Sequence, residues 1–407
     1  MKLLIATEFP PDAKGGGPAV VRQMLSPPAR LTKIFWWSVN RANAKILEGV
    51  TGECWRIADA TGFPAGKLSP SRNLTHVKAW LMEHFWAPLA ARSFSRAIDR
   101  IQPDCIWVIP HDWSILPIHK VLVDKVGSKN TNIERRRFHT TIQDYPDAHG
   151  HSLLWGNAIC DRLNRMQDDL YRLATSRDAT SIPMLDDLEI RTGEKGAQML
   201  HHGLEAEDFA FLESFASKTH SPKSKILRIA YAGTILVMRE FALFVDAMAE
   251  VRKALPVELD LWGAHSYKNE HWFDPDWMME HGNLSERNLL QELKKCDWGF
   301  IPMSLDDSDP RYNRFSFPTK FIAYLAAGLP IITLGQPESS VIKMAKRYEV
   351  GITIQDSTFR IQDLIVSLAD GGAKAKYRAE ILRCAREQFD AAKMRRKLWE
   401  ALESENG

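Results

Sequence analysis

The chain alternates short apolar runs with segments of helical periodicity, and this alternation occurs twice. The runs of the first half are KLLIAT, LTKIFWWSV, DCIWVIP, FHTTIQ, DATSI and AQMLHH, at 2–7, 31–39, 104–110, 138–143, 178–182 and 197–202. Those of the second half are LRIAYAG, VELDLWG, CDWGFIP, LPIITL and VGITI, at 227–233, 257–263, 296–302, 329–334 and 350–354. Strand-like runs separated by helical segments favour a parallel, doubly wound sheet. The pattern therefore predicts an α/β protein with two Rossmann-like domains.

Length and one polar stretch set the expected domain boundaries. A chain of 407 residues exceeds what one hydrophobic core usually serves. The polar stretch between Gly203 and Lys225 separates the two alternations. We therefore expect one domain over 1–205 and a second over 206–387. The remaining segment, 388–407, is helical and charged, with a late apolar face.

Composition and cysteine spacing exclude several classes of protein. A formal net charge of +2 gives no reason to expect nucleic acid as a partner. The five cysteines have neither CxxC nor Cys/His ligand spacing, so we expect no zinc site and the reduced thiols of a cytoplasmic protein. The N-terminal apolar run is too short for a signal peptide, and no run of about twenty apolar residues occurs. We expect a soluble protein, or one attached to a membrane only at its surface.

The stretch FSFPTKFIAYLAAGLPII, at 315–332, predicts a binding site for an anion. It places Ser316, Thr319 and Lys320 at the start of an apolar helix, and no Asp or Glu occurs between Pro310 and Pro337. Unpaired amides and the helix dipole favour negative charge at a helix N-terminus. Taken alone, the segment also fits an ordinary β/α unit with a solvated lysine.

A second cation, Arg239, follows Gly233 and Thr234 at the start of another helix in YAGTILVMREF. The helix dipole disfavours a cation at this end, and a bound diphosphate would offset that cost. A surface arginine with its stem on apolar side chains is the alternative. Two cations at helix starts in one half favour the diphosphate hypothesis.

Loops after the first-half strands carry further candidates, because ligands of open α/β sheets bind where such loops converge. The glycines at 15–17 follow the first strand and either let a backbone approach a ligand or form a flexible loop. His111 and Asp112 follow one strand, and Asp144 follows the next. These side chains suit acid–base chemistry or the binding of sugar hydroxyls, with helix capping as the alternative for the aspartates.

The order of these motifs resembles that of a known family. They run from the glycine loop and HDW through HHGLEAEDF (201–209), YAGT, LWG, HGNLSERNLLQELKKCDWGFIPM (281–303) and FPTKFIAYLAAGLPIITLG (317–335). This order looks like that of GT-B glycosyltransferases of the family four type, in which an Asn-Gly-Val-Asp…Phe linker stands where this chain has HHGLEAEDF. The resemblance covers nearly the whole chain and is strongest from Leu227 to Gly351.

The resemblance implies a reaction and a division of labour. A sugar, typically a hexose, would pass from a nucleotide diphosphate sugar held by the second domain to an acceptor held mainly by the first. The acceptor would be a glycan, a lipid-linked molecule or a small molecule, and the cleft between the domains would be the active site. Such enzymes mostly retain anomeric configuration and need neither a metal nor another cofactor. The last helix would cross back to pack on the first domain.

The resemblance also implies roles for single residues. Arg239 and Lys320 would neutralise the diphosphate, and His111 would contact the donor sugar, with Asp144 as a further catalytic candidate. The remaining donor-binding candidates are backbone or hydroxyl groups, with Gly263 near the nucleobase: Gly16, Gly17, Gly233, Thr234, Gly263, Ser316 and Thr319.

One departure from the family concerns two glutamates, eight positions apart, of which the second stands five residues before the glycine that ends the helix. Counting back from Gly328 gives Ala323 and Phe315, so both acids are missing. The replacements open to consideration are acids of the preceding loop: Asp306, Asp307 and Asp309. The loss keeps two other hypotheses open, a non-catalytic relative that binds a nucleotide sugar or a partner, and a nucleotide-sugar epimerase.

The segment HVKAWLMEHFWAPLAARSFSRAIDRIQ, at 76–102, mixes aromatic and basic residues, among them Trp80, Phe85, Arg92, Arg96 and Arg100. This mixture suits a helix that lies in an anionic membrane surface. A helix packed on the sheet with a solvated basic face is the alternative. The donor base, the acceptor, the linkage and the oligomeric state do not follow from the sequence.

Overall fold

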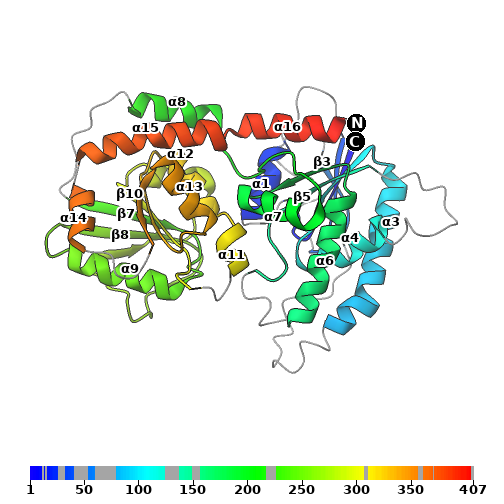
Figure 1. The fold of residues 1–407 in the computed structure, drawn as a ribbon, viewed down its shortest axis with the longest axis horizontal. Coiled ribbons are helices and arrows are strands. Elements are labelled where there is room, and N and C mark those ends of the chain that lie inside the picture. The colour runs from blue at the N-terminus through cyan, green and yellow to red at the C-terminus, as the bar shows by residue number, and fades with distance from the viewer. Residues whose placement is uncertain are drawn as a thin grey trace. The chain divides into compact units, whose positions relative to one another are not determined.

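The structure, a computed structural model, describes residues 1–11, 13, 16–25, 33–40, 54–59, 79–123, 137–148, 156–216, 226–306, 310–355, 361–369 and 371–404. It divides into two compact units, Met1–His202 with Ala391–Gly407, and Gly203–Asp390. Each unit has its own parallel sheet between layers of helices (Figure 1).

The sheet of the first unit has six parallel strands in the order β3-β2-β1-β4-β5-β6. Its strands are β1 (Lys2–Thr7), β2 (Lys33–Ser38), β3 (Cys54–Asp59), β4 (Cys105–Ile109), β5 (Phe138–Ile142) and β6 (Ser176–Ala179). The order reverses between β1 and β4. Ligands of doubly wound sheets bind at such a reversal, beyond the carboxyl ends of the strands.

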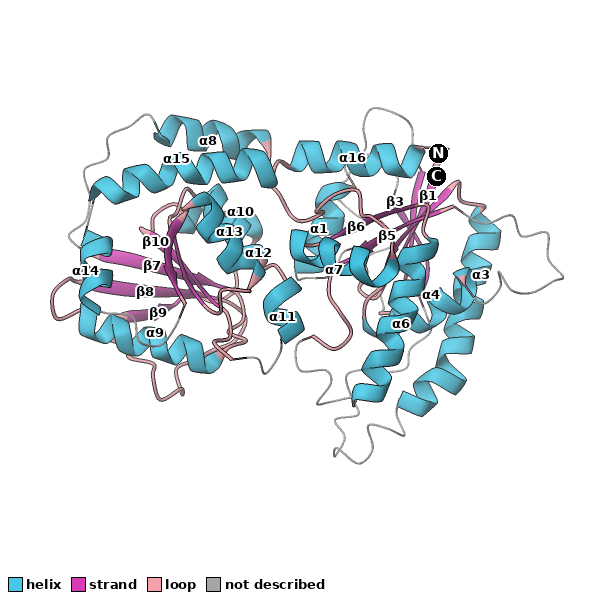
Figure 2. Ribbon diagram, viewed as in Figure 1, coloured by secondary structure: helices cyan, strands magenta, loops and turns pink. Residues whose placement is uncertain are grey.

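Helices cover both faces of this sheet. They are α1 (Gly16–Met24), the π-helical turn η2 (Met82–Trp86), α3 (Ala87–Ile101), the short η3 (Asp112–Ser114), α4 (Ile115–Leu122), α6 (Asn157–Leu173) and α7 (Ile182–Thr192). Successive side chains of a strand point to opposite faces. Leu4 and Ala6 therefore pack with α3, α4 and α6, which lie side by side in Figure 2, whereas Leu3 and Ile5 pack with α1.

The last helix, α16 (Ala391–Glu403), packs against α1 and completes the hydrophobic core between α1 and the sheet. Leu398 and Trp399 are buried there, and the Trp399 indole N–H donates to the Met24 carbonyl at 3.0 Å. The Arg395 guanidinium donates to the Gln23 carbonyl at 3.1 Å. The end of the chain thus packs on the first unit.

The second unit repeats the strand order of the first, with the order β12-β11-β10-β7-β8-β9 and a reversal between β7 and β10. Its strands are β7 (Leu227–Ala232), β8 (Val257–Trp262), β9 (Met278–Glu280), β10 (Trp298–Pro302), β11 (Ile331–Leu334) and β12 (Gly351–Ile354). Its helices are α8 (Ala206–Ala216), α9 (Met238–Val251), α10 (Glu286–Leu293), α11 (Pro310–Phe315), α12 (Thr319–Ala326), α13 (Ser340–Tyr348), α14 (Ile361–Ala369) and α15 (Gly371–Gln388). Aromatic rings fill its core, where Phe244 stacks on Phe300 at 3.6 Å between ring centroids.

The structure differs from the expected strands in two ways. The run AQMLHH is no strand and forms a single bridge, between Met199 and Ala179, so that expectation was wrong. Cys54–Asp59 and Met278–Glu280 are edge strands that the apolar pattern did not predict. Short edge strands depend on their neighbours more than on their own periodicity, because pairing on one side supplies much of their stability.

Candidate active site

Two glycines bring the carboxyl ends of β7 and β8 together in the second unit. Gly233 has a φ of 106°, a conformation that favours glycine. A Cβ on Gly263 would lie 2.9 Å from the Gly233 carbonyl oxygen. A side chain at Gly263 would therefore push the two loops apart.

Lys320 lies beside this pair of glycines, in the first turn of α12. Its Nζ is 2.7 Å from the Tyr231 hydroxyl, and a Cβ on Gly233 would lie 3.8 Å from its Cε. Burial lowers the pKa of Lys320 to about 7, and no carboxylate of the described residues pairs with it. A desolvated amine at a helix N-terminus, next to a glycine loop, suits a phosphate group.

Arg239 differs from Lys320 in both exposure and partner. It lies in the first turn of α9 with 63% of its side chain exposed, and its Nη1 is 2.9 Å from Asp306 Oδ2. Asp306 follows β10, so the pair joins the two loops at the reversal of the sheet. This acid, a candidate for the ribose contact, instead pairs with the arginine, while Asp307 and Asp309 lie outside the described residues.

The hydroxyl candidates occupy different environments. Ser316 is buried, and its carbonyl accepts a hydrogen bond from the Ser340 hydroxyl. Thr319 is exposed at the first position of α12. The Thr234 carbonyl accepts a hydrogen bond from Tyr231 at 2.8 Å. Of these residues, Thr319 is the one that presents its side chain to solvent at the helix N-terminus.

A cavity of about 120 Å³ opens at the carboxyl ends of β7 and β8 and contains an acid that sequence reasoning missed. Gly233, Gly263 and Glu280 line it. The Glu280 carboxylate accepts hydrogen bonds from the Ser266 hydroxyl, at 2.8 Å, and from the Tyr267 amide. Glu280 ends β9, a strand too short to be recognised by periodicity.

The first unit carries a second missed acid, Glu8, directly after β1. Glu8 is buried, and its carboxyl oxygens accept from the Ser114 amide at 2.7 Å and from the Asn40 side chain at 3.1 Å. Burial, and then the charge of Asp112, raise the pKa of Glu8 to about 8. The sequence did contain an indication of Glu8 as a site residue, because it directly follows the first strand and therefore lies at the same edge of the sheet as His111.

His111 follows β4 on the other side of the reversal. Its Nδ1 lies 3.3 Å from Asp112 Oδ2, and its ring lies 5.8 Å from that of Phe9. Burial lowers the pKa of His111, but the charges of Asp112, Asp144 and Glu8 outweigh that effect and raise the pKa to about 9. The acids around His111 therefore favour its protonated form.

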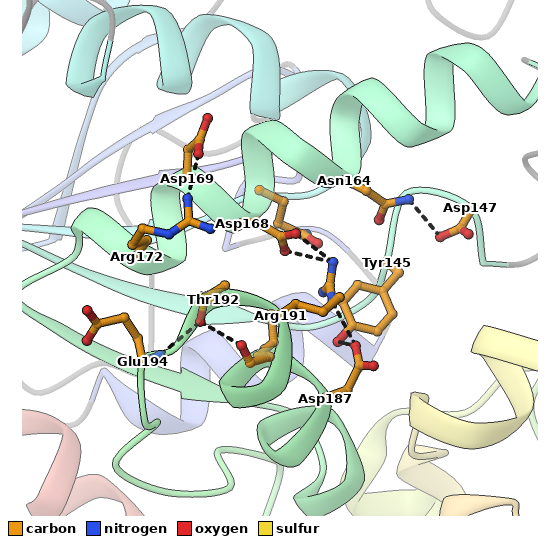
Figure 3. Close-up of polar contacts among 12 residues, drawn as sticks. Tyr145, Asp147, Asn164, Asp168, Asp169, Arg172, Asp187, Arg191, Thr192 and Glu194 are labelled. Carbon is orange, nitrogen blue, oxygen red and sulfur yellow. Dashed lines mark hydrogen bonds and ion pairs between the residues drawn. The ribbon is translucent and has the colours of Figure 1, made fainter.

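The residues next to Asp144 anchor its loop to neighbouring helices (Figure 3). The Tyr145 hydroxyl donates to Asp187 at 2.7 Å, and Arg191 bonds the same carboxylate at 2.9 Å. Asn164 donates to Asp147 at 3.2 Å. The charge of Asp144, in the same loop, contributes to raising the pKa of His111.

The glycine loop of the first unit meets the end of β5. The helix α1 begins at Gly16, and a Cβ on Gly17 would lie 2.6 Å from the Gln143 side-chain oxygen. The structure thus brings Gly16, Gly17, His111 and Asp144 to the carboxyl edge of one sheet. It brings Gly233, Gly263 and Lys320 to the same edge of the other. Within the described ranges, no three His, Cys, Asp or Glu side chains group closely enough to hold a metal ion.

Two six-stranded, doubly wound units in one chain, with the last helix on the first unit, define the GT-B fold. Solved structures agree over nearly the full length. Sucrose-phosphate synthase from Thermosynechococcus elongatus has a TM-score of 0.66 at 12% identity, over 98% of both chains. HepE from Anabaena, solved with UDP and glucose, has a TM-score of 0.61 at 13% identity over 99% of both chains. WaaG, a glycosyltransferase of lipopolysaccharide biosynthesis, has a TM-score of 0.62 at 10% identity over 99% of this chain and 100% of its own.

A family model matches the second unit more specifically. The model of the glucosyltransferase 3-like C-terminal domain matches residues 229–370. This range contains Lys320, Arg239 and the paired glycines. No curated protein sequence matches the chain.

Proposed function

We propose that the protein is a glycosyltransferase that moves a sugar, a hexose as in the family four type, from a nucleotide diphosphate sugar to a hydroxylated acceptor. The observation that carries the proposal is Lys320, a half-buried amine at the start of α12 that no described carboxylate neutralises. A diphosphate would supply the missing anion. The GT-B fold and the family match to residues 229–370 support this choice of ligand.

Each donor contact has a candidate in the second unit. Lys320 and the amides of α12 would hold the diphosphate, and Arg239 would join them on release from Asp306. Gly263 would lie against the nucleobase. Glu280 is our candidate for the hydroxyl contacts that Ala323 cannot make, because a carboxylate oxygen can accept more than one hydrogen bond.

The first unit would supply the groups at the reacting sugar. His111 would contact the sugar, and Asp144 would stabilise the positive charge of His111. Gly16 and Gly17 would leave space beneath the donor. The bond from the anomeric carbon to the diphosphate oxygen breaks, an acceptor oxygen bonds to that carbon with the same configuration, and the proton of the acceptor hydroxyl passes to the leaving diphosphate oxygen. In this proposal no metal or other cofactor takes part, because cations and helix amides stabilise the leaving diphosphate.

Transfer from labelled donors tests the proposal. UDP-, GDP- and ADP-sugars are offered with cell extract, with and without EDTA, to the wild type and to Lys320→Ala, with Lys253→Ala as a control because Lys253 pairs with Glu250 on the surface. We expect one donor to be consumed by the wild type and by Lys253→Ala, unaffected by EDTA. Binding of a nucleotide diphosphate without consumption would establish the non-catalytic relative, and conversion of the donor sugar without acceptor would establish the epimerase.

We further propose that the protein works in the cytoplasm and touches an anionic membrane through 76–102. Trp80, just before η2, Phe85 in η2 and Leu89 in α3 expose 52%, 59% and 57% of their surface, and the ring centroids of Trp80 and Phe85 lie 5.4 Å apart. Arg92, Arg96 and Arg100 follow on α3 and are also exposed. No carboxylate in the described part of the chain pairs with these arginines, and none of its helices is long and apolar enough to span a bilayer.

Sedimentation with vesicles tests the membrane contact. We expect binding to phosphatidylglycerol vesicles that falls with salt, and little binding to phosphatidylcholine, because each arginine near such a surface contributes about 1 kcal/mol. Changing Arg92, Arg96 and Arg100 to Gln, or Phe85 and Leu89 to Ser, should abolish it. Arg165→Gln and Ile190→Ser are controls, since both residues are exposed on other helices. Equal binding by all variants would contradict the proposal.

A further inference from the structure

Three tyrosine hydroxyls hold the loop that follows β7. The Tyr231 hydroxyl donates to the Thr234 carbonyl at 2.8 Å. The Ile235 amide donates to the Tyr267 hydroxyl at 2.9 Å, and the Ala232 amide donates to the Tyr324 hydroxyl at 3.0 Å. The backbone on both sides of Gly233 is therefore fixed by side chains from three elements.

One of these tyrosines also contacts Lys320. The Tyr231 oxygen lies 2.7 Å from Lys320 Nζ, and its ring centroid lies 4.2 Å from the same nitrogen. Because the Tyr231 proton is directed to Thr234, the phenol oxygen is left to accept from the amine. Tyr231 thus links the amine to the glycine loop through one atom.

Tyr267 and Tyr324 bond the same loop and supply a comparison. Tyr267 is buried at the start of the segment after β8, and its hydroxyl accepts from Ile235. Tyr324 lies on α12 and also donates toward the carbonyls of Ala230 and Phe300. No contact between either hydroxyl and Lys320 occurs among the described residues.

We propose that Tyr231 is a positioning residue that holds the Lys320 amine in register with the Gly233 loop, so that both meet the same phosphate group. This rests on the proposed function of the site as a diphosphate site. The alternative is that Tyr231 is only a core residue whose hydroxyl steadies the loop, as Tyr267 does. The two differ in whether the effect of losing the hydroxyl depends on Lys320.

A double-mutant cycle separates these roles. Affinities for UDP, GDP and ADP are measured by calorimetry for Tyr231→Phe, Tyr267→Phe, Lys320→Ala and the two double variants. Tyr231→Phe keeps the ring and should weaken the best nucleotide about 3- to 10-fold, as expected for one hydrogen bond. In the Lys320→Ala background Tyr231→Phe should lose the part of its effect that acts through the amine and keep only the part that comes from the bond to Thr234, whereas Tyr267→Phe should keep its full effect.

A second readout needs no nucleotide. The rate at which an acylating reagent labels Lys320 is followed against pH by mass spectrometry, in the wild type, Tyr231→Phe and Tyr267→Phe. Loss of an acceptor disfavours the charged amine, so the midpoint should move to lower pH in Tyr231→Phe and stay unchanged in Tyr267→Phe.

The outcomes are distinct. If the wild type binds no nucleotide diphosphate but the labelling midpoint moves as expected, the proposed diphosphate site is wrong, whereas the coupling between Tyr231 and Lys320 is confirmed. If nucleotide binds but the losses from Tyr231→Phe and Lys320→Ala add, and the midpoint does not move, Tyr231 is a core residue and the inference is overturned.

Discussion

The two units of this protein share one strand order but carry opposite chemistry at the same place in it. At the reversal of the first sheet stand Glu8 and Asp112 around His111. At the reversal of the second stand Lys320 and Arg239. Topology therefore decides where a site forms, and the side chains of the loops decide what it binds. The acidic edge suits hydroxyls and protons, and the basic edge suits a diphosphate.

The largest expected effect comes from His111, the cation of the acidic edge. We expect His111→Ala to lower turnover by about 100-fold or more, the lower range for a lost acid–base group. Affinity for the bare nucleotide diphosphate should change by less than about 3-fold, because the proposed diphosphate site lies in the second unit. Steady-state kinetics and calorimetry check this, with His271→Ala, an exposed residue, as control. A loss of nucleotide affinity as large as the loss of turnover would contradict the assignment of the sugar to the first unit and of the diphosphate to the second.

Lys320 supplies the next largest effect, on the basic edge. Charge-assisted bonds to phosphate are worth about 1.5–3 kcal/mol, so Lys320→Ala should weaken the cognate nucleotide diphosphate by about 10- to 150-fold. Calorimetry against Lys253→Ala measures it. Unchanged affinity for the nucleotide diphosphate would show that Lys320 does not bind it.

The stabilities of the two units should also change in opposite directions with pH. The pKa of Glu8 is raised to about 8 by burial, so between its ordinary value and pH 8 the folded state holds a proton that the unfolded state has lost. Stability of the first unit should fall as pH rises through this window. The pKa of Lys320 is lowered to about 7 by burial, so above pH 7 the unfolded state holds the extra proton. Stability of the second unit should rise with pH toward the ordinary lysine value.

Hydrogen exchange of peptides from β1 and β7, measured at pH 6 and pH 8.5 with correction for intrinsic rates, reports each unit separately. Glu8→Gln should flatten the decline of the first unit, and Lys320→Met the rise of the second. If the stabilities of both units change with pH in the same direction, the expected difference in protonation between Glu8 and Lys320 is wrong.

The smallest expected effect concerns Asp306, the acid that shares the basic edge. Its ion pair with Arg239 is exposed, and such pairs contribute about 0.2–1 kcal/mol. Asp306→Asn should free the arginine and tighten the cognate nucleotide diphosphate by about 2- to 5-fold. Asp246→Asn, an exposed acid on α9, is the control. Weaker binding after Asp306→Asn would instead make Asp306 a ligand of the donor.

Much of this arrangement followed from local sequence. The 2–7 and 227–232 runs predicted the central strands, because buried parallel strands are continuous apolar segments. Lys320 was predicted at a helix start from a stretch without acids and Gly233 at a strand end, and the structure has both there, whereas Gly263 was a candidate only through the family resemblance. Their positions in the fold could be predicted because strand ends and helix starts are encoded within a few residues of one another; their roles stay predictions.

The tertiary structure decided the partners. No spacing pairs Arg239 with Asp306, buries Glu8 against Asn40 and Ser114, or brings Glu280 to the glycine pair, since each contact joins loops from different strands. Burial then set the charge states, raising the pKa of Glu8 and lowering that of Lys320. The sequence determined which groups stand at the edges of the two sheets. Strand order and desolvation decided which of them meet, because both depend on neighbours that are distant in the chain.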